Sequence, residues 1–520
     1  MSGHKRGNIF KNVLSANPKS NVFDLSHDLK LSFNMGDLIP VSLMEVVPGD
    51  KFNITTEQML RLAPMISPVM HKVDVTVHFF FCPNRILWPG WETFITGGQN
   101  PDTSATPPYF DITTVKGDLA DYLGLPLGAS AQVSAIPHAV YQKIYNDYYR
   151  DQNLIPEVEC SLVDGLNPAG NFNILRRRAW EHDYFTSALP WAQKGSAVSI
   201  PIGSFDDVPV VLSGNNSPGG VRNAVTGNPA GTDGAIFGDY DAVSGTNITK
   251  TGSATGGTVF YDPANTLEAQ TSSLDLEPAT INDLRKAFRL QEWLEKNARG
   301  GTRYIEQILA HFGVKSSDAR LQRPEYLGGN KNPIVISEVL QTAEGQETPQ
   351  GNMAGHGIGI GQSKSFTYRA EEHGYIMGIM SVMPKTAYQQ GIPKHFLRTN
   401  REEYYWPTFA HLGEQPILNK ELYNVLGDPV NDDVFGYTPR YSEYKYVSSR
   451  VAGDFRDNLA FWHMGRIFGS RPNLNGNFVS SDPTHRIFAV EDPADQKIYA
   501  HVFNRVHAVR PMPLFGTPTF

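Results

Sequence analysis

The segment from residue 497 to residue 509 carries side chains that suit single-stranded nucleic acid. Apolar residues recur at every second position, which indicates a strand with one buried face. The opposite face interleaves cations with rings, so that bases could stack while phosphates meet positive charge. Its members are Lys497, Tyr499, His501, Phe503, Arg505 and His507, and we take Lys497, Tyr499, Phe503 and Arg505 as the nucleic-acid-facing candidates. The alternative is an ordinary sheet face whose cations pair with acids such as Glu491, Asp492 and Asp495.

Two other basic segments could serve the same purpose. Residues 1–20 contain no acid and four cations, which predicts a flexible basic arm; the cations are Lys5, Arg6, Lys11 and Lys19. The triplet 176–178 is all arginine and lies beside Trp180, but Glu181 and Asp183 follow at once. A cluster of ion pairs between subunits explains the triplet at least as well as nucleic acid does.

A search for catalytic or metal-binding residues finds nothing that fits. The glycines of 355–361 fall at every second position, which matches neither a P-loop nor GxGxxG, and a flexible or close-packed loop is the preferred interpretation. The acid pairs 371–372 and 402–403 are expected to be solvated charge, since neighbours on a strand point to opposite faces. Cys82 and Cys160 form no metal-binding spacing. We therefore predict no enzyme activity, no metal and no cofactor.

Composition and charge restrict the class of protein. The chain has 520 residues, of which 40% are hydrophobic and 19% charged, so it is globular. Its net charge of −8 argues against a dedicated nucleic-acid binder, although a shell that encloses nucleic acid escapes this argument if its cations lie inside. No stretch reaches the roughly 20 apolar residues of a membrane span, and the N-terminus lacks a signal peptide. We expect a soluble protein, made in a cytoplasm, with reduced cysteines.

Strand patterns stand near both ends of the chain. Residues 52–62 alternate after the turn Pro48-Gly49-Asp50, and Val69 to Phe81 alternates between apolar residues and a polar face. Gly374 to Met383 is apolar almost throughout, which indicates a buried strand. Together with residues 497–509, these segments predict a β-sandwich closed by sequence-distant strands, as in jelly rolls.

Three helices are expected in the connections between strands. Thr280 can cap a helix that runs to about Asn297 with an apolar face of Ile281, Leu284, Ala287, Phe288 and Leu294. A second helix is predicted from Arg303 to Phe312, where Gly313 can end it, and a third from Ala139 to Arg150.

Residues 203–274 have the composition of an exposed insertion. Residues 211–260 alone hold 11 of the 47 glycines, more than twice an even share, among Ser, Thr and Asn. Such a segment cannot offset the entropy of ordering with a core of its own, so it is expected to gain order against neighbouring copies. The apolar candidates for that packing are Val221, Val225, Ile236, Phe237, Val259, Phe260 and Tyr261. The alternative is a tolerated surface insertion without a role.

Several long strings resemble the major capsid protein of the Microviridae, in particular of the gokushovirus branch. They are residues 183–195 (DYFTSALPWAQKG), 300–329 (opening GGTRY and closing RPEYLGG), 372–378 (EHGYIMG), 390–396 (QGIPKHF) and 455–459 (FRDNL). These strings are spread over much of the chain and are more specific than a short catalytic motif. Residues 203–274 show no such match.

The resemblance implies a fold, an assembly and a set of partners. It implies a single domain over residues 1–520, folded as an eight-stranded viral jelly roll with large, partly helical insertions. It also implies that residues 203–274 form a variable protrusion at the threefold axes, and that this protrusion attaches to a host receptor. It implies a virion shell of about sixty copies with T=1 icosahedral symmetry around a circular single-stranded DNA genome, assembled in the cytoplasm of a bacterial host. The implied partners are a small basic DNA-binding protein, an internal scaffolding protein and a pilot protein.

The rival interpretation is a β-rich carbohydrate-binding or glycan-processing protein. It would explain the strands and the long loop, but neither the absence of a signal peptide nor the family strings. Sizing the purified protein or imaging it by electron microscopy separates the two interpretations.

Overall fold

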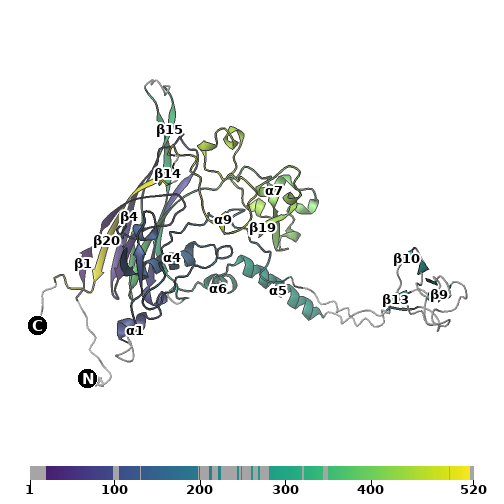
Figure 1. Cartoon of the computed structure of the whole chain (residues 1–520), viewed down its shortest axis with the longest axis horizontal. Helices are drawn as coiled ribbons and strands as arrows, with labels where there is room; N and C mark the ends of the chain where they lie inside the picture. Colours follow the sequence, from purple (N-terminus) through teal and green to yellow (C-terminus); the bar gives the residue numbers. More distant parts are fainter. Residues whose placement is uncertain are drawn as a thin grey trace, which may run out of the picture. The chain divides into compact units, whose positions relative to one another are not determined.

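The computed structural model shows a β-sandwich with helical and irregular segments on one of its sides (Figure 1). It describes residues 19–97, 105–128, 130–196, 198, 280–318, 321–342, 350–490, 492 and 494–515, and six short strands between 199 and 279. By its internal contacts the chain divides into two units, one made of residues 1–194 and 294–520 and the other of residues 195–293. The predicted insertion 203–274 lies inside the second unit.

Ten antiparallel strands form the sandwich of the first unit. Eight of them follow one hydrogen-bonded path, in which sequence-distant strands are neighbours, and β2 and β16 pair with members of that path. The path runs β1 (Asn21–Asp24), β20 (Ile498–Arg510), β4 (Lys51–Leu62), β15 (Met353–Gln362), β14 (Glu325–Leu340), β5 (Val73–Pro83), β17 (Gly374–Pro384) and β3 (Ile39–Val46). β2 (His27–Phe33) pairs with β20, and β16 (Phe366–Arg369) pairs with β4. The mainly β, jelly-roll fold expected from the sequence is confirmed.

The long strand β14 joins the two sheets of the sandwich. Its first part, Glu325 to Ile334, pairs with β5, whereas Val335 to Leu340 pairs with β15. One sheet therefore contains β20, β4 and β15, and the other contains β5, β17 and β3. Apolar side chains of both sheets meet in one buried core, which includes Phe52, Val77, Ile376 and Val502.

The alternating strands behave as predicted on their apolar faces. Every second residue of β4 from Phe52 to Leu62 is buried, and β20 buries every second residue from Ile498 to Ala508. The turn before β4 contains Gly49 with φ +92°, a backbone conformation that favours glycine. β17 is buried along nearly its whole length, as its apolar sequence indicated.

β5 differs from the prediction in its start and in its polar face. It begins at Val73 rather than Val69, and its polar residues Asp74 and Thr76 are buried as well. The reason is the cover on the outer side of this sheet, where Arg178 donates a hydrogen bond to Thr76 and Lys331 pairs with Asp74 at 3.2 Å. Further along the same side, Phe80 packs in a second apolar layer with the helix α3 (Ile136–Ile144). α3 is the third predicted helix. It begins at Ile136 rather than at Ala139 and continues as a π-helical turn, Tyr145–Tyr149.

The glycine-rich segment 355–361 is a strand and not the loop that we expected. It forms most of β15, and a side chain at its alternate glycines would collide with neighbouring segments. A Cβ atom at Gly355 would lie 2.2 Å from the backbone oxygen of Ser67, and one at Gly357 would lie 2.6 Å from Leu62 Cδ1. Close packing, against backbone at Gly355 and against the Leu62 side chain at Gly357, therefore favours glycine despite its poor strand propensity.

The two other predicted helices form where the sequence placed them. α5 (Ile281–Arg299) begins after Thr280, whose Oγ1 accepts a hydrogen bond from the backbone N–H of Asp283. α6 (Tyr304–Phe312) ends at Gly313, which has φ +67°. None of the helices in the described ranges combines the length and apolar character that a membrane span needs.

The remaining elements are short and lie in the connections. The first unit also contains β6 (Tyr109–Thr113), β7 (Ser130–Ser134), β18 (Glu414–Leu418), β19 (Val434–Pro439), α1 (Trp91–Thr96), α2 (Leu119–Tyr122), α4 (Ala169–Phe172), α7 (Asn419–Leu422), α8 (Ser442–Lys445) and α9 (Gly476–Val479). The second unit contains β8 (Val210–Leu212), β9 (Val221–Asn223), β10 (Val243–Ser244), β11 (Asn247–Ile248), β12 (Val259–Tyr261) and β13 (Leu267–Ala269).

Candidate nucleic-acid interface

The solvent-facing side of β20 carries the predicted rings and cations. Tyr499 is 45% exposed, and the side chains of His501 and Arg505 are 42% and 52% exposed. Phe503 is half-buried between them. β20 thus places both aromatic and cationic groups at the surface, while its alternate residues fill the core.

Neighbouring strands extend this surface in rows, because directly paired residues of antiparallel strands share a face. Tyr499 pairs with Arg61 of β4 on one side and with Ser32 of β2 on the other. One row further along β20, His501 stands between Met59 and Lys30.

Phe503 follows in the next row, between Glu57 of β4 and Asp28 of β2. We call the exposed side of β2, β20, β4 and β16 the outer sheet face. On it the rings of Tyr499 and Phe503 alternate with charged groups.

A groove of about 370 Å³ lies where β20, β4 and β15 meet on this face. Met59, Ile360 and Phe503 supply its apolar lining, and Glu57 and His501 supply polar groups. Ile360 is 74% exposed, so the groove is open along its β15 side. A flat ring such as a nucleobase fits a surface of this kind, since stacking requires an apolar plane with polar groups at its edge.

Two carboxylates neutralise part of the positive charge of the outer sheet face. Glu57 pairs with Arg505 at 3.0 Å, and Asp28 pairs with Lys30 and, at 3.1 Å, with His501. Hydrogen bonds from Lys30 and His501 lower the pKa of Asp28. The described acids that pair with His501 and Arg505 of β20 therefore come from β2 and β4. Of the acids named in the alternative interpretation, Glu491 lies outside the described residues.

Three further cations of the outer sheet face have no carboxylate partner among the described residues. They are Lys51 and Arg61 on β4 and Arg369 on β16, where Arg369 pairs in register with Lys51. Sequence reasoning missed them, although the polar positions of β4 alternate visibly. The missing information was which strands flank β20, and that depends on pairings between segments more than 400 residues apart.

Lys497 does not belong to this surface. It precedes β20, is only 1% exposed, and its Nζ donates a hydrogen bond of 2.6 Å to the backbone oxygen of Asp492. The predicted nucleic-acid-facing role of Lys497 is therefore not retained. Its buried ammonium group is instead tied by this hydrogen bond to the turn before β20.

Of the four cations of the basic arm, Lys19 lies among the described residues. Lys19 is exposed and leads into β1, which pairs with the C-terminal half of β20. Lys5, Arg6 and Lys11 lie outside the described residues. Of the arm, the structure thus places only residues 19 and 20, next to the strand that pairs with β20.

The arginine triplet 176–178 is held within its own chain. Arg178 donates hydrogen bonds to Thr76 Oγ1 at 2.6 Å and to Ser381 Oγ at 3.0 Å, and Arg177 pairs with Asp482 at 2.6 Å. These contacts fasten the segment to the outer side of the β5–β17 sheet. Arg177 is therefore ion-paired within its own chain, and ion pairs of the triplet with a neighbouring subunit stay a prediction.

The candidate residues for packing of the insertion are only partly described. Val221 and Tyr261 pair directly in β9 and β12, and Val259 and Phe260 belong to the same pair of strands. Val225, Ile236 and Phe237 lie outside the described residues. The intersubunit role of this group stays a prediction.

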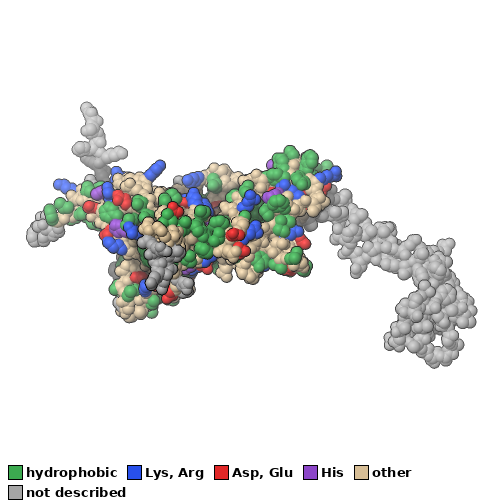
Figure 2. Space-filling model, turned by 90° about the horizontal axis from the view of Figure 1, so that it is seen from above, with side chains coloured by type: hydrophobic (Ala, Val, Ile, Leu, Met, Phe, Trp, Pro, Cys, Tyr) green, Lys and Arg blue, Asp and Glu red, His purple; other side chains and the backbone are tan. Residues whose placement is uncertain are grey.

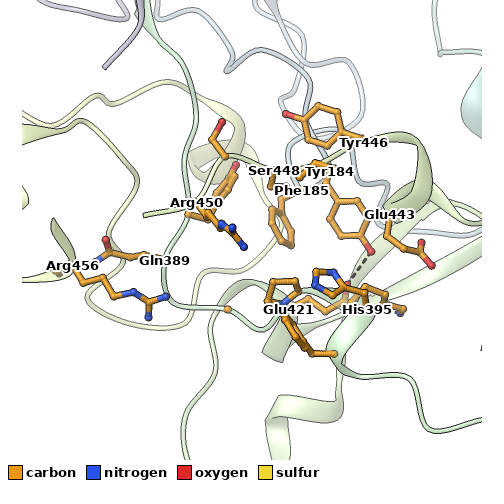
Figure 3. Close-up of a pocket in the computed structure, with 17 residues that line it drawn as sticks. Tyr184, Phe185, Gln389, His395, Glu421, Glu443, Tyr446, Ser448, Arg450 and Arg456 are labelled. Atoms are coloured by element: carbon orange, nitrogen blue, oxygen red, sulfur yellow. Dashed lines mark hydrogen bonds and ion pairs between the residues drawn. The ribbon is translucent and has the colours of Figure 1, made fainter. Parts of the chain in front are cut away.

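A cavity of about 680 Å³ between segments 184–185, 388–396 and 443–456 is the place where a catalytic site would be sought (Figure 3). Its acid Glu421 accepts hydrogen bonds from Tyr184 Oη at 2.9 Å and from Lys394 Nζ at 3.0 Å. Burial, and then the charge of Glu421, raises the pKa of Tyr184, which stays protonated. Glu443, the second acid, is paired with Arg398 at 3.0 Å.

Ion pairing of this kind leaves the cavity without a free carboxylate for acid–base chemistry. One acid of each pair singled out in the sequence is likewise engaged: Glu372 pairs with Arg85 at 2.6 Å, and Glu403 accepts hydrogen bonds from the backbone N–H groups of Thr399 and Asn400. Within the described ranges, no three His, Cys, Asp or Glu residues are grouped so that they could hold a metal ion. Cys82 and Cys160 are free thiols.

Comparison with known proteins gives matches over nearly the whole chain. A family profile described as capsid protein (F protein) matches residues 11–520. The chain is 38% identical to the capsid protein VP1 of Bdellovibrio phage phiMH2K, over 98% of this chain and 97% of that protein. It is 34% identical to VP1 of Chlamydia phage 1, over 99% of both chains, and 32% identical to VP1 of Spiroplasma virus 4, over 96% and 95%.

Proposed function

The chain belongs to the phage capsid protein (F protein) family, and from this premise we propose that about sixty copies form a closed T=1 shell around a circular single-stranded DNA genome. Its family confirms the resemblance found in the sequence and makes it a structural component of the virion; we propose no enzymatic role for it. The rival interpretation as a glycan-processing protein is not retained.

The outer sheet face is the observation that carries the DNA-binding part of this proposal. It combines exposed rings on β20 with five cations, only two of which are paired with acids: Lys30, Lys51, Arg61, Arg369 and Arg505. In the proposed shell this face and the arm of residues 1–20 are turned toward the genome. The net charge of −8 supports a further small basic protein that neutralises most of the DNA.

The three unpaired cations provide the test. Lys51→Gln, Arg61→Gln and Arg369→Gln are combined in one variant, and binding of a single-stranded oligonucleotide is measured against salt concentration. Each lost phosphate contact lowers the slope of log K against log salt by about 0.7, so three lower it by about 2.

The matched control removes three exposed lysines from other elements: Lys116→Gln, Lys315→Gln and Lys445→Gln. This control changes the net charge by the same amount. Its slope of log K against log salt is expected to equal that of the unmodified chain. Equal slopes for the two variants would contradict DNA binding at the outer sheet face.

Residues 203–274 are proposed as the outward projection and the host-attachment surface. The supporting observations are the glycine-rich composition and the division of the chain, which makes residues 195–293 a separate unit. Three such units meeting at a threefold axis would give a multivalent surface from weak single sites. Replacing residues 211–260 with a short Gly-Ser linker should leave shells intact and reduce attachment to the host. Unchanged infectivity would show that the insertion is dispensable.

The remaining partners follow the family resemblance. We propose an internal scaffolding protein and a pilot protein, and assembly in the cytoplasm of the bacterial host. Purification of particles from infected cells, with identification of the proteins that remain bound, tests this set. Particles that contain the chain and DNA without any such protein would contradict it.

A further inference from the structure

A group of aromatic side chains lies at the surface of the segment 396–447. This segment contains none of the strands that form the outer sheet face. Tyr404, Tyr405, Trp406 and Tyr444 are each 50–51% exposed. We call these four residues the aromatic platform. On the face shown in Figure 2, hydrophobic side chains likewise gather at the surface, with basic and acidic groups between them.

The aromatic platform is held rigid from below by one buried arginine. The guanidinium of Arg398 lies 5.2 Å from the ring centre of Tyr404 and 4.4 Å from that of Tyr444, and its side chain is only 8% exposed. Arg398 also pairs with Glu443 at 3.0 Å, and Glu443 accepts a second hydrogen bond from Gln415 at 2.7 Å. The two segments that carry the rings are therefore joined through a buried polar network.

Further contacts fix the individual rings. The backbone N–H of Tyr405 donates to Tyr444 Oη at 3.2 Å, and the ring of Tyr405 stands at 5.1 Å, edge to face, from that of Tyr441. Trp406 Nε1 donates to the backbone oxygen of Arg401 at 2.9 Å. Rings fixed before binding lose little entropy when a partner covers them.

Rigid, half-exposed aromatic residues with arginine are typical of the central part of protein interfaces. A fully buried ring contributes about 150–250 Å², so four half-exposed rings offer on the order of 300–500 Å². That is about half of the roughly 800 Å² that each partner buries in a standard interface. Arg401 and Glu402 stand beside the rings with side chains 88% and 66% exposed, so the rim offers both signs of charge.

We propose that a second copy of this chain covers the aromatic platform in the assembled shell. The inference rests on the proposed function, because a family of self-assembling capsid proteins requires contact surfaces between copies. The rim of mixed charge favours a copy of the same chain over DNA, which would require an excess of cations. Trp406 is the central anchor of the contact.

The test measures whether the platform is covered on assembly. Tyr405→Cys is introduced together with Cys160→Ser, since the remaining native thiol, Cys82, is fully buried. The reaction with a small maleimide is followed in isolated subunits and in shells formed from the purified chain alone. We expect the rate in shells to fall by at least about tenfold, because the core of an interface excludes water and solutes.

Leu426→Cys is the matched control, because Leu426 is 98% exposed and lies outside the platform. Its thiol is expected to react at similar rates in subunits and shells. The inference would be overturned if the thiol at position 405 stays reactive in shells or is slowed no more than the control. Protection of that thiol only when DNA is present would overturn it too. None of these results would contradict the proposal that the chain forms shells. If the chain forms no shells, the proposed function fails and the inference fails with it.

A second variant tests the energetic role of the anchor. Trp406→Asp should abolish shell formation, whereas Leu426→Asp should permit it. Circular dichroism and thermal unfolding of the isolated subunits establish that both variants fold, which is expected because Trp406 is half-exposed and Leu426 is almost fully exposed. Normal assembly of folded Trp406→Asp subunits would contradict the proposal.

Discussion

Replacing Glu57 with glutamine should strengthen the binding of single-stranded DNA. Glu57 lies on the outer sheet face, where its carboxylate pairs with Arg505 at 3.0 Å and stands in register with Phe503. Glutamine keeps the size of the side chain and removes the charge. Arg505, which is 52% exposed, then becomes available to a phosphate.

The size of the effect follows from counterion release. One additional phosphate contact steepens the slope of log K against log salt by about 0.7. Between 50 and 200 mM salt, the variant should therefore lose about 2.6-fold more affinity than the unmodified chain, and it should bind more tightly at the lower concentration. Fluorescence anisotropy of a labelled oligonucleotide with isolated subunits measures both quantities.

Glu45→Gln is the matched control for this experiment. Glu45 is exposed on β3, in the other sheet, so this variant changes the net charge equally without touching the outer sheet face. We expect its slope to equal that of the unmodified chain. If Glu45→Gln strengthens binding as much as Glu57→Gln does, the effect belongs to net charge and the assignment of the face is refuted.

Three predictions concern stability, each measured by chemical or thermal unfolding of isolated subunits. Asp50→Ala should lower the unfolding free energy by about 3 kcal/mol, because it removes a fully buried carboxylate that accepts two hydrogen bonds from Arg510; a loss below about 1 kcal/mol would contradict this. Burial lowers the pKa of His138 to about 4, so stability should be full above about pH 6.5 and fall as the pH drops toward 4, and His138→Leu should flatten that slope. Gly357→Ala should cost about 1–3 kcal/mol, because its Cβ would lie 2.6 Å from Leu62 Cδ1; a neutral effect would show that the Leu62 side chain or β15 can shift to make room.

The strands that could be predicted are those in which local alternation coincides with burial. β4 and β20 bury every second residue because each has one face on the core and one on solvent. β5 misled the prediction at its polar positions, because Thr76 is covered by Arg178, which lies about a hundred residues further along the chain. The alternation of residues within one segment cannot show that a side chain from a distant segment covers it.

The candidate site was predictable in one strand and not across strands. The rings of Tyr499 and Phe503 follow from period-two alternation, but their neighbours Arg61 and Glu57 depend on the register between β20 and β4. Lys497 was misassigned because alternation does not say where a strand begins, and the backbone turns before Ile498.

The aromatic platform had no sequence signal of comparable strength. Its residues come from two segments about forty positions apart, and they form one surface only through tertiary contacts: the buried Arg398 between Tyr404 and Tyr444, and the hydrogen bond from Tyr405 to Tyr444.

Electron cryo-microscopy of particles assembled from this chain tests the central claim most directly. The account predicts closed icosahedral shells of about sixty copies, with the outer sheet face of β20 and β4 turned toward the interior. Subunits that remain monomeric, or shells in which Tyr499 and Arg61 lie on the outer surface, would contradict it.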